Sequence, residues 1–381
     1  MNILIANKFY YNRGGSEVYS MELEKLLLNA GHKVAFFAMN CPENDKSIWQ
    51  KYWVSQFSLK TPFRPFGDKE TKIKFSNLLD DFKPDVVHLN IIHTHISPVI
   101  AEIASNRGIK VVWTMHEYKL ICPNYLCLNG KGEICEKCFD GNKKHCTKNN
   151  CKNNLLASYL LQKEAEKWNG ERLEKCVDAF ICPSEFMKQK MLQGGFSENK
   201  LHILHNFIDI PESSKSFNQA NQGSDNYYAY IGRLSKEKGT ETLCSAASKL
   251  PYKLKIAGTG HLENKLKKKY RHCKQIEFLG HKNKESTLQI MAGARFTVCP
   301  SEWYENNPLS VVESLCLGVP VLGADIGGIP ELTNHLFESG NENNLREKIE
   351  KMWMADLRIC QNSEIIEKFS SKNYLEKLKR I

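Results

Sequence analysis

Hydrophobic and polar positions follow a regular rhythm along the first third of the chain. Short apolar runs alternate with longer stretches in which apolar residues recur every three or four positions. The runs ILIAN, KVAFFAM, PDVVHLN and KVVWTMH predict strands, and residues 16–30 and 99–106 predict amphipathic helices. Strands and helices in alternation indicate a parallel β-sheet covered on both faces. Ligands of such sheets bind beyond the carboxyl ends of the strands.

The middle of the chain contains further elements and one connector. Residues 155–176 read as one long amphipathic helix whose apolar stripe packs in the core, with a membrane-facing stripe as the alternative. The run DAFIC predicts a strand, followed by a helix capped by Ser184. Residues 211–226, rich in Ser, Asn, Gln and Gly, predict a surface connector. The strand–helix rhythm restarts at YYAYIG, which indicates a second domain.

The stretch SEWYENNPLSVVESLCLGVP, residues 301–320, concentrates several signals in one short segment. Asn307 is a good N-cap residue, and Pro308 suits the first position of a helix, where its missing N–H costs nothing. Gly318 tolerates the left-handed conformation that ends a helix, and Pro320 cannot extend one. The sequence therefore predicts a short helix here.

Two carboxylates flank this helix start. Glu313 lies on the same helical stripe as Leu309 and Leu317, so its charge is expected to need a polar partner from the protein or a ligand. Glu305 comes just before the helix N-terminus, where free N–H groups favour an anion. Simple neutralisation of the helix dipole is the structural alternative for Glu305.

Three other segments fall at predicted strand ends. Gly14 and Gly15 follow the first strand, where paired glycines allow close approach of a ligand or form an ordinary turn. His88, His93 and His95 follow the PDVV strand; His88 is either a satisfied core residue or a functional one, and a metal site of two histidines would lack a nearby third ligand. His116 follows the KVVWT strand and is either a core residue or a functional imidazole that can donate a hydrogen bond.

Cysteines are concentrated in residues 122–151, where six of the fourteen occur. This segment is rich in Lys, Asn and Gly, so apolar burial alone would hardly fold it, and a metal ion could hold it together. The predicted ligands of a structural zinc ion are Cys135, Cys138, Cys146 and Cys151, with Cys122, Cys127 or His145 as substitutes.

Size and charge bound the remaining possibilities. With 381 residues and 41% hydrophobic content, the chain can fill two α/β domains. It has no apolar run of about twenty residues and no secretion signal, and its cysteines fit a reducing compartment, so a cytoplasmic protein is expected. The net charge of +10 favours anionic partners such as nucleotide phosphates, nucleic acid or an anionic membrane face.

Several of these motifs together resemble glycosyltransferase family 4, a family of retaining enzymes with the GT-B fold. The pair Glu305 and Glu313 matches its E-x7-E signature, and GRLSKEKG, residues 232–239, matches its G-R-L-x-x-x-K-G segment. The GG loop and the segment Thr114–Glu117 resemble weaker motifs of the family, and a subset carries a similar Cys-rich insertion. The chain departs from the pattern at residues 306–308, where many members have glycines.

The resemblance implies a GT-B architecture of two Rossmann-like domains. The acceptor-binding domain would span residues 1–195, with the Cys-rich insertion at 122–151, and the nucleotide-sugar domain would span 196–365. A C-terminal helix, residues 366–381, would return to the first domain.

It also implies site residues. Arg233 and Lys238 would neutralise the donor diphosphate, Glu305 would hold the donor sugar, Glu313 would bind the ribose, and His116 would contact the sugar or leaving group. These imply catalytic roles for His116, Glu305, Arg233 and Lys238. The donor-binding residues implied are Gly14, Gly15, Gly232, Arg233, Lys238, Gly258, Phe278, Leu279, Asn306, Asn307, Leu309 and Glu313.

The implied reaction moves a sugar from a UDP- or GDP-sugar to a glycan or polyprenyl-linked acceptor without a catalytic metal, in the synthesis of bacterial surface polysaccharide such as capsule or lipopolysaccharide. The enzyme would work in the cytoplasm, with peripheral membrane contact as an option and without nucleic acid. Two alternatives stay open: a GT-B sugar-nucleotide epimerase, which needs no acceptor, and a zinc-stapled nucleic-acid-binding module, suggested by the cysteines and the basic charge.

Overall fold

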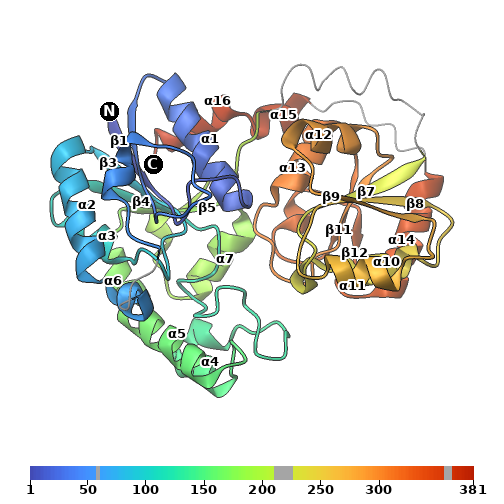
Figure 1. Ribbon diagram of the computed structural model, residues 1–381, viewed down its shortest axis with the longest axis horizontal. Helices are drawn as coiled ribbons and strands as arrows, with labels where there is room; N and C mark the ends of the chain where they lie inside the picture. Colours follow the sequence, from blue (N-terminus) through green and yellow to red (C-terminus); the bar gives the residue numbers. More distant parts are fainter. Residues whose placement is uncertain (57–60, 210–225, 356–362) are drawn as a thin grey trace. The chain divides into compact units, whose positions relative to one another are not determined.

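The computed structural model describes residues 1–56, 61–209, 226–355 and 363–381, and the chain divides into two compact units. The first unit comprises Met1–His205 together with Lys377–Ile381, and the second comprises Asn206–Glu376 (Figure 1). The expected boundary after residue 195 precedes β6, which pairs with β5 and therefore belongs to the first unit. Most of the predicted connector, residues 210–225, lies outside the described residues.

The first unit contains a six-stranded parallel sheet within its described residues, in the order β2-β1-β3-β4-β5-β6. Its strands are β1 Asn2–Ala6, β2 Lys33–Phe37, β3 Val86–Leu89, β4 Lys110–Thr114, β5 Ala179–Cys182 and β6 Leu201–Ile203. Its helices are α1 Gly15–Asn29, η1 Ile48–Tyr52, η2 Thr61–Phe66, α2 Lys69–Phe82, α3 Val99–Ser105, η3 Lys137–Asp140, α4 Lys144–Lys148, α5 Leu155–Lys167, α6 Gly170–Glu174, α7 Glu185–Gln193 and η4 Glu198–Lys200.

The second unit repeats this plan in the strand order β12-β11-β10-β7-β8-β9, again within the described residues. Its strands are β7 Tyr227–Ile231, β8 Lys253–Ala257, β9 Ile276–Gly280, β10 Thr297–Cys299, β11 Val321–Ala324 and β12 Leu336–Phe337. Its helices are η5 Lys236–Lys238, α10 Thr240–Ala247, α11 Glu263–Lys269, α12 Lys284–Ala292, α13 Leu309–Cys316, η6 Ile329–Glu331, α14 Glu342–Met354 and α15 Ser363–Lys368; α16 Ser371–Leu378 leads back to the first unit. Two helices replace the single one expected for residues 366–381.

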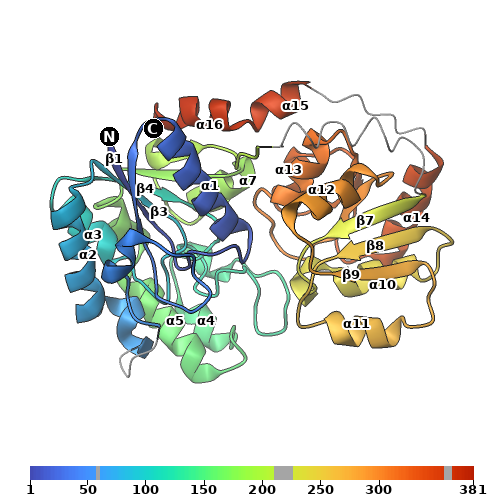
Figure 2. The same ribbon diagram turned by 45° about the horizontal axis from the view of Figure 1, so that its top comes forward.

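The strand order of the second unit creates a point where the chain reverses its direction across the sheet. From β7 the chain proceeds to β8 and β9, and it then returns to the other side of β7 to add β10, β11 and β12. Right-handed crossovers in opposite directions place their helices on opposite faces. Accordingly α10 and α11 cover one face and α12 and α13 the other (Figures 1 and 2). The carboxyl ends of β7 and β10 lie at this reversal, which is where sheets of this kind bind ligands.

The predicted strands and helices of the α/β rhythm are confirmed, and each sheet is a buried parallel one. The strands read as continuous apolar runs because helices cover both faces; Leu4, Ile5 and Ala6 of β1, for example, are fully buried. In the second unit the main cluster of buried apolar side chains has members along the sequence from Tyr228 of β7 to Met352 of α14. The fold class predicted from the sequence, two Rossmann-like domains, is confirmed.

Two local predictions are wrong. Residues 155–176 form two helices, because the chain leaves helical geometry at Trp168 and Asn169 caps α6 by accepting a hydrogen bond from the Arg172 N–H. The helix after Glu305 begins one residue later than predicted, with Pro308 rather than Asn307 at the N-cap position. The side chain of Asn307 instead accepts from the backbone N–H of Asn206, 3.1 Å away. Gly318 does adopt the left-handed conformation after this helix, with φ of 72°.

Candidate active site

The second unit brings Lys238 and Glu305 into direct contact, in the segments that follow β7 and β10. The Nζ atom of Lys238 lies 2.5 Å from Oε1 of Glu305 and 4.9 Å from the centre of the Trp303 ring. The same Oε1 accepts hydrogen bonds from the Ser301 hydroxyl, at 2.6 Å, and from the Trp303 indole N–H, at 2.9 Å. Oε2 of Glu305 bonds to none of the residues that the structure describes. The contacts of Glu305 are thus concentrated on one carboxylate oxygen.

The charge state of Glu305 follows from these contacts. Its side chain is buried, which by itself raises a carboxyl pKa. The Lys238 ammonium and the hydrogen bonds from Ser301 and Trp303 outweigh burial and hold the pKa of Glu305 below its ordinary value. Glu305 is therefore an anion that accepts hydrogen bonds at neutral pH.

Glycines determine how closely the surrounding loops pack. Gly239, which opens α10, has φ of 64°, and a Cβ atom there would lie 1.7 Å from the Pro300 carbonyl oxygen. Gly327 also has φ of 64°. A Cβ atom there would lie 2.3 Å from the Glu305 carbonyl oxygen. The Gly328 N–H donates to the Glu305 carbonyl at 2.7 Å. Side chains at these glycines would push the loop that carries Glu305 away from Lys238.

Gly232 and Gly258 meet where β7 and β8 end. A Cβ atom on Gly258, whose φ is 144°, would lie 1.9 Å from the Gly232 carbonyl oxygen. Arg233 follows directly, with its side chain 61% exposed and its guanidinium 3.1 Å from Oε1 of Glu237. Arg233 is therefore exposed just after β7, five residues before Lys238. An anion that binds the Arg233 guanidinium would compete with Glu237.

Glu313 has a protein partner. Its side chain is 10% exposed on α13 and pairs with the Nζ atom of Lys284, which lies on the first turn of α12. The expectation of a polar partner for Glu313 is confirmed, and the partner is a cation that the sequence reading did not identify.

The other predicted donor-binding residues are spread around the carboxyl edge of this sheet. Phe278 and Leu279 lie at the end of β9 and are half-buried, and Phe278 packs against the core. Asn307 is buried against Asn206, whereas Asn306 and Leu309 are half-buried in the loop and first turn of α13. Four of these five side chains, all except Asn307, are thus partly accessible to solvent.

In the first unit, His116 lies just beyond β4 and is held by Asn90, which follows β3. Nε2 of His116 is 2.9 Å from Oδ1 of Asn90, and the Asn90 amide nitrogen faces the Ala6 carbonyl. Nε2 therefore carries the proton and Nδ1 is an acceptor. Burial, aided by the nearby His88, lowers the pKa of His116 to about 3. The expected hydrogen-bond donor is thus an acceptor on its remaining nitrogen, because Asn90 takes the only N–H.

Tyr19 of α1 packs edge-on against His116, with ring centres 4.7 Å apart. Its hydroxyl lies 3.3 Å from the Thr114 hydroxyl, which in turn lies 2.7 Å from Nε2 of His88. His88 is 2% exposed, and burial lowers its pKa to about 4. His88 is a satisfied core residue, which confirms the structural alternative.

Gly14 and Gly15 lie where α1 begins, with Gly14 at the N-cap position and no side chain capping the helix.

The other two histidines that follow β3 differ in their surroundings. His95 is half-buried, and its Nδ1 has no hydrogen-bond partner among the described residues. Burial and the cations Lys8, Arg64 and Arg13 lower the pKa of His95 to about 4. His93 stacks on Trp113, with ring centres 5.3 Å apart.

Glu117, next to His116, was not singled out from the sequence. Burial raises its pKa to about 7, partly offset by the cations Lys119 and Lys8. Asn90, Tyr19, Trp303 and Lys284 were also missed. Only the acidic residue after His116 had a signal in the sequence, as part of the T-x-H-D/E segment; the other four act through contacts between distant segments.

The structure does not support the predicted zinc site. Within the described part of the chain, no three His, Cys, Asp or Glu side chains are arranged to hold a metal ion. The six cysteines of the insertion are free thiols, and hydrogen bonds link Cys122 with Cys127 and Cys146 with Cys151. Burial raises the pKa of Cys138 to about 12, so it stays a protonated thiol.

A buried lysine helps to hold the Cys-rich segment together. Nζ of Lys143 donates to the carbonyls of Ile121 and Cys138, at 2.9 and 2.7 Å, and so links the start of the segment to its middle. Lys119 and Glu164 form an ion pair at 2.8 Å, with each side chain 4% exposed, that joins the preceding loop to α5. Buried polar contacts thus contribute to the packing of the insertion.

Two family models match the chain. The model described as Glycosyltransferase Family 4 matches residues 13–212, and the model described as Glycosyl transferases group 1 matches residues 212–358. The chain belongs to glycosyltransferase family 4. A protein from the cps region of Klebsiella pneumoniae is 25% identical to this family member over 360 residues, which cover 88% of each chain. The O-antigen biosynthesis glycosyltransferase WbnH of Escherichia coli is 28% identical over 201 residues, 49% of this chain and 57% of WbnH.

Solved structures of glycosyltransferases share the fold of this family 4 protein. HepE of Anabaena, in complex with UDP and glucose, matches with a TM-score of 0.68 and 15% identity over 100% of this chain and 98% of HepE. The lipopolysaccharide outer core galactosyltransferase WaaB matches with a TM-score of 0.66 and 16% identity, covering 100% and 98%. Each likeness supports the GT-B fold. Within the described ranges, every helix is too short or too polar to span a lipid bilayer.

Proposed function

We propose that this family 4 glycosyltransferase transfers a sugar from a nucleoside diphosphate sugar, UDP- or GDP-linked, to a glycan or polyprenyl-linked acceptor, with retention at the anomeric carbon. The observation that carries the proposal is the contact between Lys238 and Glu305 in the second unit. A cation and an oriented carboxylate there suit the two parts of such a donor, the diphosphate and the sugar hydroxyls. The relatives from cps and O-antigen systems support a role in capsule or lipopolysaccharide synthesis.

In this proposal the diphosphate binds to Arg233 and Lys238. Arg233 is exposed and Lys238 follows in the next turn, so both can reach an anion at the end of β7. Gly232 and Gly258 let the backbone approach the phosphates closely. The two cations stabilise the negative charge that develops on the leaving diphosphate, so the proposed reaction uses no catalytic metal.

The sugar and the nucleoside bind to the two carboxylates. Oε2 of Glu305 accepts hydrogen bonds from the sugar hydroxyls, while Oε1 remains bound to Lys238, Ser301 and Trp303. Glu313 accepts from the ribose hydroxyls, and Phe278 and Leu279 lie beside the base. Residues 306–309 follow Glu305 and contribute to the shape of the sugar site.

His116 and the GG loop, on the first unit, complete the proposed set. Nδ1 of His116 accepts a hydrogen bond from a hydroxyl of the sugar, and Gly14 and Gly15 approach the donor through backbone N–H groups. The acceptor oxygen bonds to the anomeric carbon on the face from which the diphosphate departs. The bond from carbon to the diphosphate breaks, and the acceptor proton passes to the departing phosphate oxygen. The enzyme would act at the cytoplasmic face of the membrane, in peripheral contact with it.

The decisive experiment compares Arg233→Ala with a matched surface variant. Lys265→Ala is a suitable control because Lys265 is exposed and paired with Glu241, as Arg233 is exposed and paired with Glu237. Donor sugars are first screened by thermal shift with UDP- and GDP-sugars, and turnover is then measured. Arg233→Ala should lower turnover by a factor of about 100 or more, and Lys265→Ala should leave it unchanged. Near-normal turnover of Arg233→Ala would refute the phosphate assignment.

The same assay separates the alternatives. A sugar-nucleotide epimerase would convert the donor to an isomeric nucleotide sugar without any acceptor, whereas the proposed transferase releases nucleoside diphosphate and needs an acceptor for rapid turnover. Membership in family 4 and the contact between Lys238 and Glu305 favour sugar transfer over the nucleic-acid-binding module.

A further inference from the structure

The first five residues of α5 expose three large apolar side chains. Leu155, Leu156 and Tyr159 are 65%, 68% and 46% exposed. Ser158 and Gln162, on the adjoining side of the helix, are buried. The core stripe predicted for this helix is therefore wrong for its first turns. An exposed apolar cluster of this kind marks an interaction surface.

Polar contacts hold α5 in this orientation. The Ser158 hydroxyl accepts from the Lys152 N–H at 3.1 Å, and the side chain of Gln162 accepts from the Thr147 hydroxyl at 2.6 Å. A helix rotated to bury its leucines would break both bonds as well as the buried pair of Lys119 and Glu164. The outward direction of the leucines is thus built into the packing.

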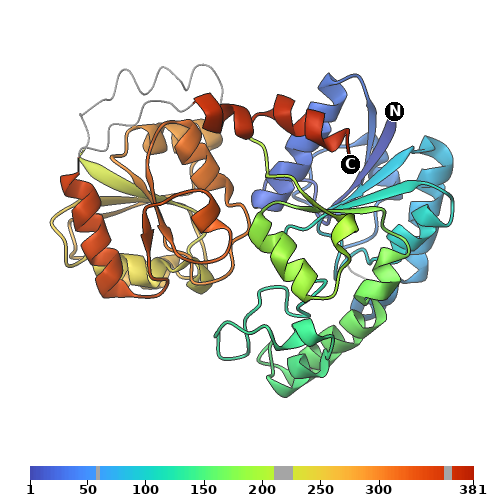
Figure 3. The ribbon, with the colours of Figure 1, turned by 180° about the vertical axis from the view of Figure 1, so that it is seen from behind.

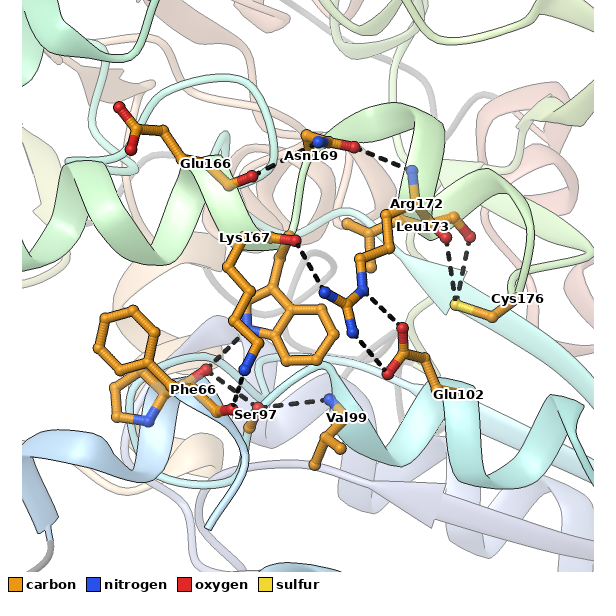
Figure 4. A network of polar contacts seen from close by, with 12 residues as sticks. Phe66, Ser97, Val99, Glu102, Glu166, Lys167, Asn169, Arg172, Leu173 and Cys176 are labelled. Atoms are coloured by element: carbon orange, nitrogen blue, oxygen red, sulfur yellow. Dashed lines mark hydrogen bonds and ion pairs between the residues drawn. The ribbon is translucent and has the colours of Figure 1, made fainter.

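The C-terminal end of α5 is anchored as well (Figure 4). Lys167 donates to the Phe66 carbonyl at 2.6 Å, and the Trp168 indole N–H donates to the Pro65 carbonyl at 2.7 Å. Just beyond, Arg172 binds both carboxylate oxygens of Glu102, at 2.6 and 3.1 Å. The helix is fixed at one end to η2 and α3, and its apolar first turn points away from these anchors.

Exposed lysines lie on the helix that packs beside α5 and in the loop that precedes it. Helix α4 packs beside α5 (Figures 1 and 3) and carries Lys144 and Lys148, both exposed. Lys131 and Lys137, in the preceding loop, are also exposed. Within the described ranges none of these four lysines forms a close ion pair, although Lys144 interacts electrostatically with Glu166. Exposed apolar side chains next to a helix that carries exposed lysines match the interface of an anionic lipid bilayer.

We propose that the α4–α5 surface, made by Leu155, Leu156 and Tyr159 together with Lys144 and Lys148, docks on an anionic membrane. The leucines and the tyrosine enter the boundary between headgroups and acyl chains, and the lysines contact the anionic headgroups. A second copy of the chain fits less well, because a symmetric contact would bring the same lysines of both copies together. Three side chains also bury far less than the roughly 1,200 Å² of a stable interface.

This surface deepens the proposed function, on which its purpose rests: it would hold the enzyme where a polyprenyl-linked acceptor is embedded. Membrane binding itself is measured without donor or acceptor. Loss of transfer activity and loss of vesicle binding can therefore be told apart.

The test is flotation of the full chain with vesicles of phosphatidylcholine alone or with about one third phosphatidylglycerol. The protein should float with the anionic vesicles, and raised salt should weaken this binding. A Tyr159→Trp variant should show a blue-shifted emission when anionic vesicles are added. Absence of binding to the anionic vesicles would overturn the proposal.

Two variants make the test specific. The triple variant Leu155→Asn, Leu156→Asn and Tyr159→Ser should bind at least tenfold more weakly, while Ile48→Asn should bind like the parent. Ile48 is the matched control because it is 79% exposed in the same unit but lies on η1. Equal binding by both variants would locate the contact elsewhere and refute this surface. A dimer, seen by light scattering and dissociated only by the triple variant, would show that a second copy covers it and would equally refute the proposal.

The lysines are tested separately. Lys144→Gln with Lys148→Gln should reduce binding to anionic vesicles at least threefold, and circular dichroism should show an unchanged fold. Unchanged binding of this double variant would contradict the part of the proposal that assigns headgroup contact to α4.

Discussion

Asn90 fixes the tautomer of His116. Its Oδ1 lies 2.9 Å from Nε2 of His116, so the ring donates there and presents Nδ1 as an acceptor. The two residues follow neighbouring strands, β3 and β4, which pair in parallel register, and this places them side by side. The arrangement resembles the way in which a carboxylate or a carbonyl orients a catalytic imidazole, except that the neutral amide leaves the ring uncharged.

Replacing Asn90 by aspartate should convert a neutral ring into one that titrates. A carboxylate within hydrogen-bonding distance favours the imidazolium, so the pKa of His116 should rise from about 3. We expect kcat of Asn90→Asp to fall at least tenfold at neutral pH and to recover partly as the pH rises. The parent should show no step from His116 between pH 5 and pH 9, because its ring is already neutral there. The pH profile of kcat and the ring-nitrogen NMR shifts of His116 measure this.

A purely structural role for Asn90 would give a different outcome. Asn90→Asp would then lower stability without adding a titration to the profile. The melting temperature, followed in parallel, separates the two cases.

Four histidines, two buried and two half-buried, should make the first unit less stable in acid. Burial lowers the pKa of His88 and His95 to about 4, that of His116 to about 3, and that of His93 well below its ordinary value. Between these values and about 6.5, the unfolded chain binds more protons than the folded one, so stability rises with pH in that window. The raised pKa values of Glu117, about 7, and of Glu24 act in the opposite direction.

The melting temperature should therefore be about 5 °C or more lower at pH 5 than at pH 7. His88→Gln should reduce this slope, since Gln does not titrate. His145→Gln is the control, because His145 is partly exposed and pairs with Asp140 on the surface. A slope that stays the same in His88→Gln would show that these histidines do not set the acid sensitivity.

Gly239 should not tolerate alanine. Its φ is 64°, and a Cβ atom would lie 1.7 Å from the Pro300 carbonyl oxygen, which is rigid backbone. Gly31 provides the comparison, because its φ is 82° but no atom lies within 4 Å of a Cβ there. Gly31→Ala introduces backbone strain alone, whereas Gly239→Ala adds a clash. Gly239→Ala should therefore lower the melting temperature by about 5 °C more than Gly31→Ala does. Thermal melts of both variants check this, and equal melting temperatures would contradict the close approach.

Glu313 should discriminate between nucleotides with and without a ribose hydroxyl. We expect the parent to bind UDP or GDP about tenfold more tightly than the corresponding 2′-deoxy or 3′-deoxy nucleotide. Glu313→Gln should bind all of them weakly and nearly alike. Calorimetric titration gives these affinities.

Lys284→Ala is the informative companion, because Lys284 is the ion-pair partner of Glu313. If Glu313 only neutralises Lys284, both variants should keep the preference for the intact ribose, and the nucleoside role of Glu313 would be wrong.

Sequence reasoning located the site residues better than it located their partners. The segments carrying Glu305, Arg233, Lys238 and His116 follow strands, and strand ends were predictable because each strand is a continuous apolar run. Lys238 and Glu305 were both identified, but their contact was not, since 67 residues separate them. Asn90, Lys284 and Trp303 lie in segments whose patterns resemble ordinary loops and helix starts, so nothing marked them.

The failures have a common cause. The helix predicted over residues 155–176 was placed in the core because its apolar stripe has the right spacing, yet spacing does not say which side faces the protein. The cysteines were grouped around zinc because the spacing of Cys135 and Cys138 suits a metal knuckle, yet spacing does not say which thiols meet, and the described residues include no group of three arranged to hold a metal ion.

The sequence by itself determined the α/β class, the repeat of the rhythm in a second unit, and the positions of the chemistry-bearing segments at strand ends. These depend on local periodicity and on where apolar runs stop. The tertiary structure decided which nitrogen of His116 is free, which oxygen of Glu305 is engaged, and which side of α5 meets solvent. Those properties depend on contacts between residues far apart in the chain, where burial and a single neighbouring group fix a proton or an orientation.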